Sequence, residues 1–134
     1  MNDFQKILDI TFPFVETLLK DYGEFYPLAT IVNNNGNVKQ FTLEEDSEND
    51  FPKSDAVIGE IKKNLRWNQD EFVAFALFYD VFLNENGLDA IAVLVEHKIE
   101  QKAYTFYYPY KIGEDKIEFF ESWKTEEIIS VFNI

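Results

Sequence analysis

Hydrophobic residues recur at every third or fourth position through residues 2–22. This spacing gathers them on one stripe of a helix, and the stripe consists of Phe4, Ile7, Leu8, Thr11, Val15, Leu18, Leu19 and Tyr22. Asn2 suits the position before the first turn, and Gly23 suits the position after the last. Pro13 lies inside the pattern, lacks a backbone N–H and crowds the preceding turn. We therefore predict either a helix that kinks at Pro13 or two helices that abut there.

Extended segments follow this helix. The apolar run Leu28–Val32 precedes the sequence NNNGN, in which Asn-Gly favours a tight turn with positive φ. The apolar residues of the returning strand are Val38, Phe41 and Leu43. Together these features predict a β-hairpin.

A second helix is predicted, because apolar residues again recur at helical spacing. Ser54 or Asp55 can cap its start, and Trp67 lies at its end. Its inward-facing residues are Val57, Ile58, Ile61 and Leu65. The next stretch, Phe72–Leu83, has a length that suits a helix, but its apolar residues are continuous and rich in Phe, Tyr and Val. That composition favours a buried strand, which is our prediction.

Two more strands meet at a turn that we place at Gln101–Lys102. This register puts β-branched residues and the histidine against aromatic rings, in the pairs Ile99 with Tyr104, His97 with Phe106 and Val95 with Tyr108. A last strand is predicted at Ile117–Trp123, followed by a short helix capped by Thr125. The predicted fold class is therefore α+β, an antiparallel sheet of about six strands with helices packed on it, in the order α-β-β-α-β-β-β-β-α.

Length and composition restrict the class of protein. The 134 residues fit a single domain, 1–134, and a hydrophobic content of 46% with 14 Phe and 7 Tyr indicates a folded chain. The N-terminal stretch has no basic region and no small-residue cleavage site, so we expect no secretory signal and a cytoplasmic location. The absence of cysteine removes disulfides and thiolate chemistry.

The formal net charge is −13, from 25 acidic and 12 basic residues. This charge disfavours nucleic-acid binding, because phosphates are neutralised by Lys and Arg. It favours association with a basic protein partner, although it also serves simply to keep an aromatic-rich protein in solution. We expect no nucleic-acid partner and no membrane partner, and a monomer or a weak homodimer.

The only histidine, His97, follows Glu96 in a predicted strand. Successive strand residues point to opposite faces of a sheet, so Glu96 cannot orient the imidazole ring. His97 is then either a buried, hydrogen-bonded residue or a general base. Asp80 lies inside a run of aromatic residues and is either a buried, hydrogen-bonded carboxylate or the anchor of a ligand pocket. In the simplest register Asp80 faces Val93, roughly 13 Å from His97. The candidate pocket residues are Asp80, His97, Tyr104 and Tyr108.

Carboxylates are dense in the predicted loop after residue 43. Alternate acids between Glu44 and Asp50 resemble a calcium loop, but the central glycine and the distal glutamate of such a loop are missing. A solvated acidic loop is the interpretation we favour, and weak cation binding is the alternative. The glycines all stand alone, which excludes a phosphate loop, and no serine lies in a nucleophile elbow. The sequence predicts no cofactor, no metal and no catalytic residue.

Aromatic residues alternate through the segment YTFYYPY. One face of this strand carries four rings that are expected in the core, and the opposite face exposes Tyr107, together with Trp67 or Trp123 from elsewhere in the chain. An exposed aromatic patch ringed by acids suits protein binding. The candidate partner-binding residues are Glu44, Glu45, Asp46, Glu48, Asp50, Trp67 and Tyr107.

Three segments, FYPLATIVNNNG, DAIAVLVEH and YTFYYPYK, resemble in this order a group of small bacterial proteins of unknown function. That group carries a similar Phe-Tyr-Pro strand start, an Asp-Ala-Ile strand that ends in Glu-His, and a Pro-Tyr strand end. The resemblance spans about residues 25–110 and implies a family without implying an activity. The order of elements also resembles, more distantly, roadblock and profilin-like domains, which serve as scaffolds and dimerisation modules. The additional strand before the last helix departs from that pattern.

Three classes of function fit these observations. The first is a non-catalytic, acidic protein-interaction module, of which an immunity-type inhibitor of a basic partner is a specific version. The second is a small-molecule-binding protein with a pocket near Asp80 and His97. The third is an enzyme that uses His97 or a pair of carboxylates. We predict the first class, a protein that acts by binding rather than by catalysis.

Overall fold

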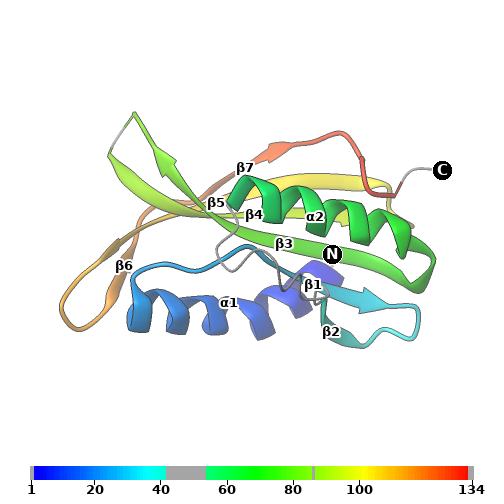
Figure 1. Cartoon of the computed structure of the whole chain (residues 1–134), viewed down its shortest axis with the longest axis horizontal. Coiled ribbons are helices and arrows are strands. Elements are labelled where there is room, and N and C mark those ends of the chain that lie inside the picture. Colours follow the sequence, from blue (N-terminus) through cyan, green and yellow to red (C-terminus); the bar gives the residue numbers. More distant parts are fainter. Residues whose placement is uncertain (1, 42–53, 86, 133–134) are drawn as a thin grey trace.

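The computed structural model describes residues 2–41, 54–85 and 87–132. These ranges contain two α-helices, seven β-strands and one short 3₁₀ turn (Figure 1). In chain order the elements are α1 (Asn2–Tyr22), β1 (Leu28–Asn33), β2 (Val38–Phe41), α2 (Ser54–Trp67), η1 (Gln69–Glu71), β3 (Phe72–Leu83), β4 (Leu88–His97), β5 (Lys102–Ile112), β6 (Ile117–Phe119) and β7 (Trp123–Glu126).

The strands form one antiparallel sheet. Their order across the sheet is β2-β1-β3-β4-β5-β6, and β7 pairs with β5 at the position along the strand that β6 leaves free. The long strands β3, β4 and β5 make up its centre. The predicted fold class, α+β with an antiparallel sheet and packed helices, is confirmed.

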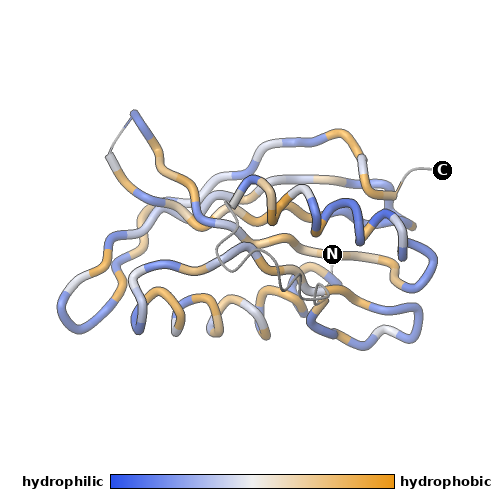
Figure 2. The backbone as a smooth tube through the Cα atoms, in the orientation of Figure 1, coloured by the Kyte–Doolittle hydropathy of each residue, from blue (hydrophilic) through white to orange (hydrophobic). Residues whose placement is uncertain are grey.

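Alternate residues of the central strands separate two hydrophobic cores. On one face, the even-numbered residues of β3 from Ala74 to Phe78 pack with α1. On the other face, Phe75 and Leu77 pack with residues of α2 such as Ile61. From Ala74 to Phe78 both faces of β3 are buried, which explains the continuous apolar sequence of that part of the strand. Figure 1 shows the two helices on opposite sides of the sheet, and Figure 2 shows hydrophobic residues along the central strands and hydrophilic residues at the turns.

α1 is one continuous element from Asn2 to Tyr22, so the alternative of two abutting helices is wrong. Pro13 lies inside it, and Oγ1 of Thr17 donates a hydrogen bond to the Pro13 carbonyl at 3.0 Å. Gly23 ends the helix as predicted, with a φ of 75° and its N–H bound to the Leu19 carbonyl. Neither α1 nor α2 combines the length and the apolar character that a membrane-spanning helix needs.

The predicted hairpin, second helix and central strand are also confirmed. β1 and β2 are joined by the NNNGN turn, in which Gly36 has a φ of 84°. α2 buries Ile61 and Leu65, and Phe72–Leu83 is β3. Leu43 lies outside the described residues.

The predicted register between β4 and β5 is wrong by four residues. Val95 pairs with Tyr104 instead of Tyr108, and His97 pairs with Lys102. The turn occupies residues 98–101, so Ile99 is an exposed turn residue. Gln101 adopts a φ of 54° there, a conformation that the sequence does not signal with a glycine. Because the shift is an even number of residues, every side chain keeps its predicted face.

The C-terminal part also differs from the prediction. The expected strand Ile117–Trp123 is broken into β6 and β7, and the segment expected to form a helix from Thr125 begins as part of β7. Residues 127–132 contain no helix. They return across the α2 face of the sheet, where Val131 and Phe132 enter the core beside Phe72 and Phe75.

Candidate functional site

Glu96 anchors the C-terminal segment to the α2 face of the sheet. Its side chain is fully buried, and its carboxylate accepts hydrogen bonds from the backbone N–H groups of Ser130, Val131 and Phe132 at 3.2, 3.0 and 3.3 Å. The Ser130 hydroxyl donates a further bond at 3.1 Å. Three backbone donors compensate for the burial of the carboxylate, so the role of Glu96 is structural.

His97 anchors α1 to the opposite face. Its Nε2 lies 2.7 Å from Oδ2 of Asp3, and its Nδ1 accepts a hydrogen bond from the Glu100 N–H at 3.2 Å. Because Nδ1 accepts, Nε2 carries the proton and donates to Asp3. The residue is only 4% exposed. With both ring nitrogens bonded and little room for a substrate, the geometry favours the structural interpretation of His97 over a general base.

Asp80 is half-buried on the α1 face and accepts a hydrogen bond from the Tyr110 hydroxyl at 2.8 Å. Burial disfavours its charged form and raises the pKa of Asp80 to about 6, against the lowering effect of the Tyr110 bond, and Asp89 and Glu24 raise it further. Burial and the bond to Asp80 raise the pKa of Tyr110 well above its usual value. The geometry matches a hydrogen-bonded carboxylate.

The four candidate pocket residues do not meet in one pocket. Asp80 pairs with Ile91 instead of Val93, whereas His97 pairs with Ala74 at the other end of the hairpin. Six strand positions separate them, about 20 Å. Tyr108 lines the groove described next, and the lining of that groove includes none of the other three.

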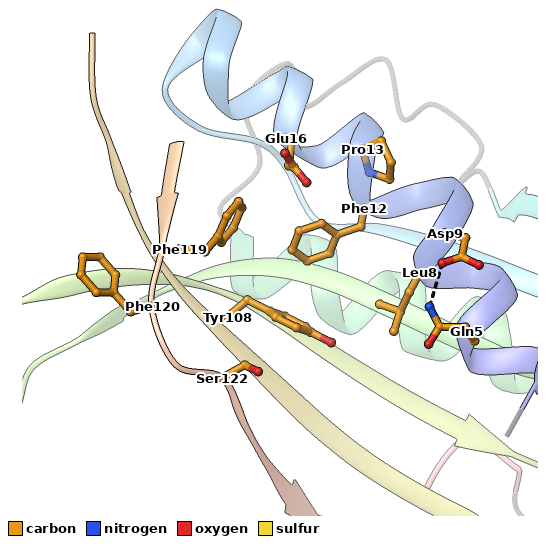
Figure 3. A pocket seen from close by; sticks show the side chains of 10 residues that line it. All are labelled: Gln5, Leu8, Asp9, Phe12, Pro13, Glu16, Tyr108, Phe119, Phe120 and Ser122. Atoms are coloured by element: carbon orange, nitrogen blue, oxygen red, sulfur yellow. Dashed lines mark hydrogen bonds between the residues drawn. The ribbon is translucent and has the colours of Figure 1, made fainter. Parts of the chain in front are cut away.

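This groove, with a volume of about 570 Å³, lies on the α1 face between the helix and the outer strands (Figure 3). Its lining combines aromatic rings with carboxylates, and consists of Gln5, Leu8, Asp9, Phe12, Pro13, Glu16, Tyr108, Phe119, Phe120 and Ser122. Figure 3 shows Tyr108 between the helix and Ser122, with Phe12 pointing from α1 toward the strands.

Pro109 explains why the strand side of the groove is irregular. Its carbonyl accepts a hydrogen bond from the Phe120 N–H at 2.9 Å, so this edge of the Pro109 backbone faces the outer strands. Because proline has no N–H, it cannot donate the second bond to those strands. The register shifts by one residue here, because Tyr110 pairs with Phe119 whereas Tyr107 pairs with Trp123. The shift is a β-bulge over residues 120–122. The strand is interrupted at this point, and the small residue Ser122 lies beside the groove.

α1 supplies the other side of the groove. The Phe12 ring packs edge-on against Tyr108 at 4.9 Å and lies 5.6 Å from the ring of Phe119. Asp9 and Glu16 lie three residues before and four residues after Phe12, so all three share a helix face. Asp9 is oriented by the Gln5 amide, which donates to its Oδ1 at 2.7 Å.

The charge of the groove has one sign. Asp9 and Glu16 are acidic, and among the described residues that line the groove none is basic. The ion pairs within the described ranges involve neither of these two carboxylates. A cationic group is therefore the natural complement of this site.

The structure describes two of the candidate partner-binding residues, Trp67 and Tyr107, and they lie far apart. Trp67, at the end of α2, is 88% exposed. Tyr107 stacks on Trp123 at 5.3 Å and lies level with Tyr79 across the sheet. Trp67 lies near Phe72, the first residue of β3. Tyr79 is seven residues further along that strand, about 23 Å away, so Tyr107 is distant from Trp67. The acids Glu44, Glu45, Asp46, Glu48 and Asp50 lie outside the described residues.

The groove was not predicted from the sequence. Asp9 and Glu16 have the pattern of a solvated helix face, and Phe12 lies beside the main apolar stripe. Two signals point toward it in retrospect: an aromatic residue flanked by acids at helical spacing, and a proline inside a strand, which is typical of an edge or a bulge. Within the described part of the chain, no group of three His, Asp or Glu side chains is placed to hold a metal ion.

Comparisons with protein-family models, with curated proteins and with solved structures each find no match. The two resemblances stated from the sequence therefore stay predictions, and the geometry of the groove is the basis for a proposal about function.

Proposed function

We propose that the protein is a non-catalytic interaction module that binds a basic segment of a protein partner in the groove between α1 and the β6–β7 bulge. The observation that carries this proposal is the lining of the groove, in which Phe12, Tyr108 and two further rings combine with Asp9 and Glu16. Aromatic anchors surrounded by charge are typical of the energetic centres of protein interfaces.

The whole-molecule charge supports the same proposal. A net charge of −13 speeds the encounter with a basic partner and makes the complex sensitive to salt. An inhibitor of the immunity type, which covers a working surface of a basic protein, would be one use of such a module. The alternative of a small-molecule pocket at Asp80 and His97 has no support, because these residues are far apart and each is bonded to a structural partner.

The test compares three baits in pull-downs from lysate of the source cells. One is the unmodified protein, one carries Asp9→Lys and Glu16→Lys, and the control carries Glu60→Lys and Asp70→Lys. The control reverses the same number of charges at exposed positions outside the groove lining. Circular dichroism first establishes that all three baits are folded.

We expect a basic protein that is retained by the unmodified bait and by the control, is lost from the groove variant, and elutes as salt is raised. Equal retention by both variants would place the contact elsewhere and contradict the proposal. The absence of any salt-sensitive basic partner would contradict it as well.

A further inference from the structure

We infer that the groove recognises a single cationic side chain of its partner, preferentially an arginine, held over the rings of Tyr108 and Phe12 and paired with the carboxylate of Asp9 or Glu16. This inference rests on the proposed function and specifies its chemistry. It is carried by the way the same row of rings is used elsewhere in the molecule.

β5 presents a row of rings to the α1 face, and the chain itself covers part of that row with a cation. Nζ of Lys124 lies 4.4 Å from the centre of the Tyr104 ring and 6.0 Å from that of Phe106. An ammonium over aromatic faces at these distances is attracted by the ring electrons. Tyr108 is the next ring in the row, stacked at 6.4 Å from Phe106. The row therefore contains a further ring, that of Tyr108, which lies in the groove beyond the two rings covered by Lys124.

Ser122 marks the boundary between the part of the row that Lys124 covers and the groove. β7 places Lys124 opposite Phe106, whereas the residue beside Tyr108 in the groove is the small Ser122. A long side chain at residue 122 would cover Tyr108. The small side chain of Ser122, next to the bulge opposite Pro109, instead leaves this part of the α1 face to a ligand.

The carboxylates are arranged for a donor with directional N–H groups. Asp9 and Glu16 are seven residues apart in α1, about 10.5 Å along the axis, with Phe12 between them. A cation above Phe12 reaches either one. A guanidinium is planar, stacks on rings and binds a carboxylate through two parallel bonds, so it matches this arrangement better than an ammonium.

The test is an NMR titration of the ¹⁵N-labelled full chain with N-acetyl-arginine methylamide. N-acetyl-citrulline methylamide is the neutral probe of nearly the same shape, and N-acetyl-lysine methylamide is the second cation. We expect saturable shifts centred on the amides of Phe12, Tyr108 and Ser122 for arginine, weaker ones for lysine and none for citrulline. Asp9→Asn with Glu16→Gln should weaken arginine binding about tenfold, as expected for the loss of a charge-assisted bond.

Glu60→Gln with Asp70→Asn removes the same charge from exposed positions outside the groove lining and should leave arginine binding unchanged. Phe12→Leu keeps an apolar side chain but removes a ring, and should weaken binding; Phe14→Leu, an exposed position on the same helix, should not. Shifts that spread over the acidic surface without saturation, or equal shifts with citrulline, would overturn the inference. If the partner still depends on the groove in the pull-down while arginine fails here, the inference is wrong and the proposed function stands.

Discussion

The two faces of the sheet are closed in different ways. On the α2 face, the C-terminal segment returns over the sheet, and the carboxylate of Glu96 binds three consecutive backbone N–H groups of that segment. On the α1 face, the helix approaches Tyr108 with Phe12 but leaves a groove whose carboxylates, Asp9 and Glu16, have no cationic partner among the described residues.

This difference separates carboxylates that hold the fold from carboxylates that are available to a ligand. The oxygens of Glu96 are occupied by donors that are fixed in the backbone, and the residue has no contact with solvent. Asp9 is exposed and accepts one bond from a neighbouring side chain on its own helix. Fixed, buried donors give stability, whereas exposed carboxylates beside rings retain the capacity to bind another molecule.

The largest expected effect comes from removing the buried anchor. Glu96→Ala deprives three backbone N–H groups of their acceptor and leaves a cavity, so the free energy of unfolding should fall by about 3–5 kcal/mol. Urea unfolding followed by tryptophan fluorescence measures this change. Glu60→Ala, an exposed position on α2, should change it by less than about 0.5 kcal/mol. A loss below about 1 kcal/mol for Glu96→Ala would mean that the C-terminal segment does not depend on this carboxylate.

A smaller effect is expected at His97, on the other face. His97→Gln weakens the bond to Asp3, and the free energy of unfolding should fall by about 1–2 kcal/mol. In a double-mutant cycle with Asp3→Asn the two losses should be coupled by about 1 kcal/mol, because the residues share one interaction. Partner binding in the groove should be unchanged. An unchanged melting temperature with loss of partner binding would instead assign His97 to function.

Much of the fold follows from local sequence patterns. The stripe of α1, the continuous apolar run of β3 and the opposite orientation of Glu96 and His97 all depend on residue spacing, which the sequence contains directly. The β4–β5 register does not, because its turn uses Gln101 at positive φ without a glycine to mark it. The faces were still predicted correctly, since an error of four residues preserves the alternation.

The C-terminal helix was predicted from local chemistry that a distant residue overrides. Thr125 and the acids after it are typical of a helix start, and a helix through residues 130–132 would use their N–H groups internally. Glu96, more than 30 residues earlier in the chain, takes those N–H groups, and Val131 and Phe132 gain burial in the core. Local propensity is a weak preference compared with the burial of a paired carboxylate and two apolar side chains.

The candidate site was harder to predict, because the groove depends on three segments that only the tertiary structure brings together. Asp9 and Phe12 come from the first helix, Tyr108 from β5, and Ser122 from the bulge. Tyr108 was among the candidate pocket residues. Asp80 lies level with it, two strands away across Ile91, but does not line the groove, and His97 lies at the other end of the hairpin. Pro109 marks the bulge in the sequence, but the proline alone does not say which helix faces it.

The smallest expected effect, and one of opposite sign, concerns Asp80. Its carboxylate accepts a hydrogen bond from the Tyr110 hydroxyl, whereas that of Glu96 accepts bonds from three backbone N–H groups and one hydroxyl. The pKa of Asp80 is about 6 in the folded protein against an ordinary 3.8, so its charged form costs stability in full above pH 6, and the cost is relieved as the pH falls from 6 toward 4. Asp80→Asn keeps an acceptor for the Tyr110 hydroxyl and removes the charge. The variant should be more stable than the unmodified protein at pH 7.5 by up to about 1 kcal/mol, a figure reduced for the partial contact of Asp80 with solvent.

Urea unfolding at several pH values should show this difference shrinking toward zero near pH 4, while Glu85→Gln, exposed on the same hairpin, shows no such trend. A difference that stays constant with pH would mean that Asp80 is as well satisfied as Glu96, and the contrast between a saturated and an undersupplied carboxylate would not hold.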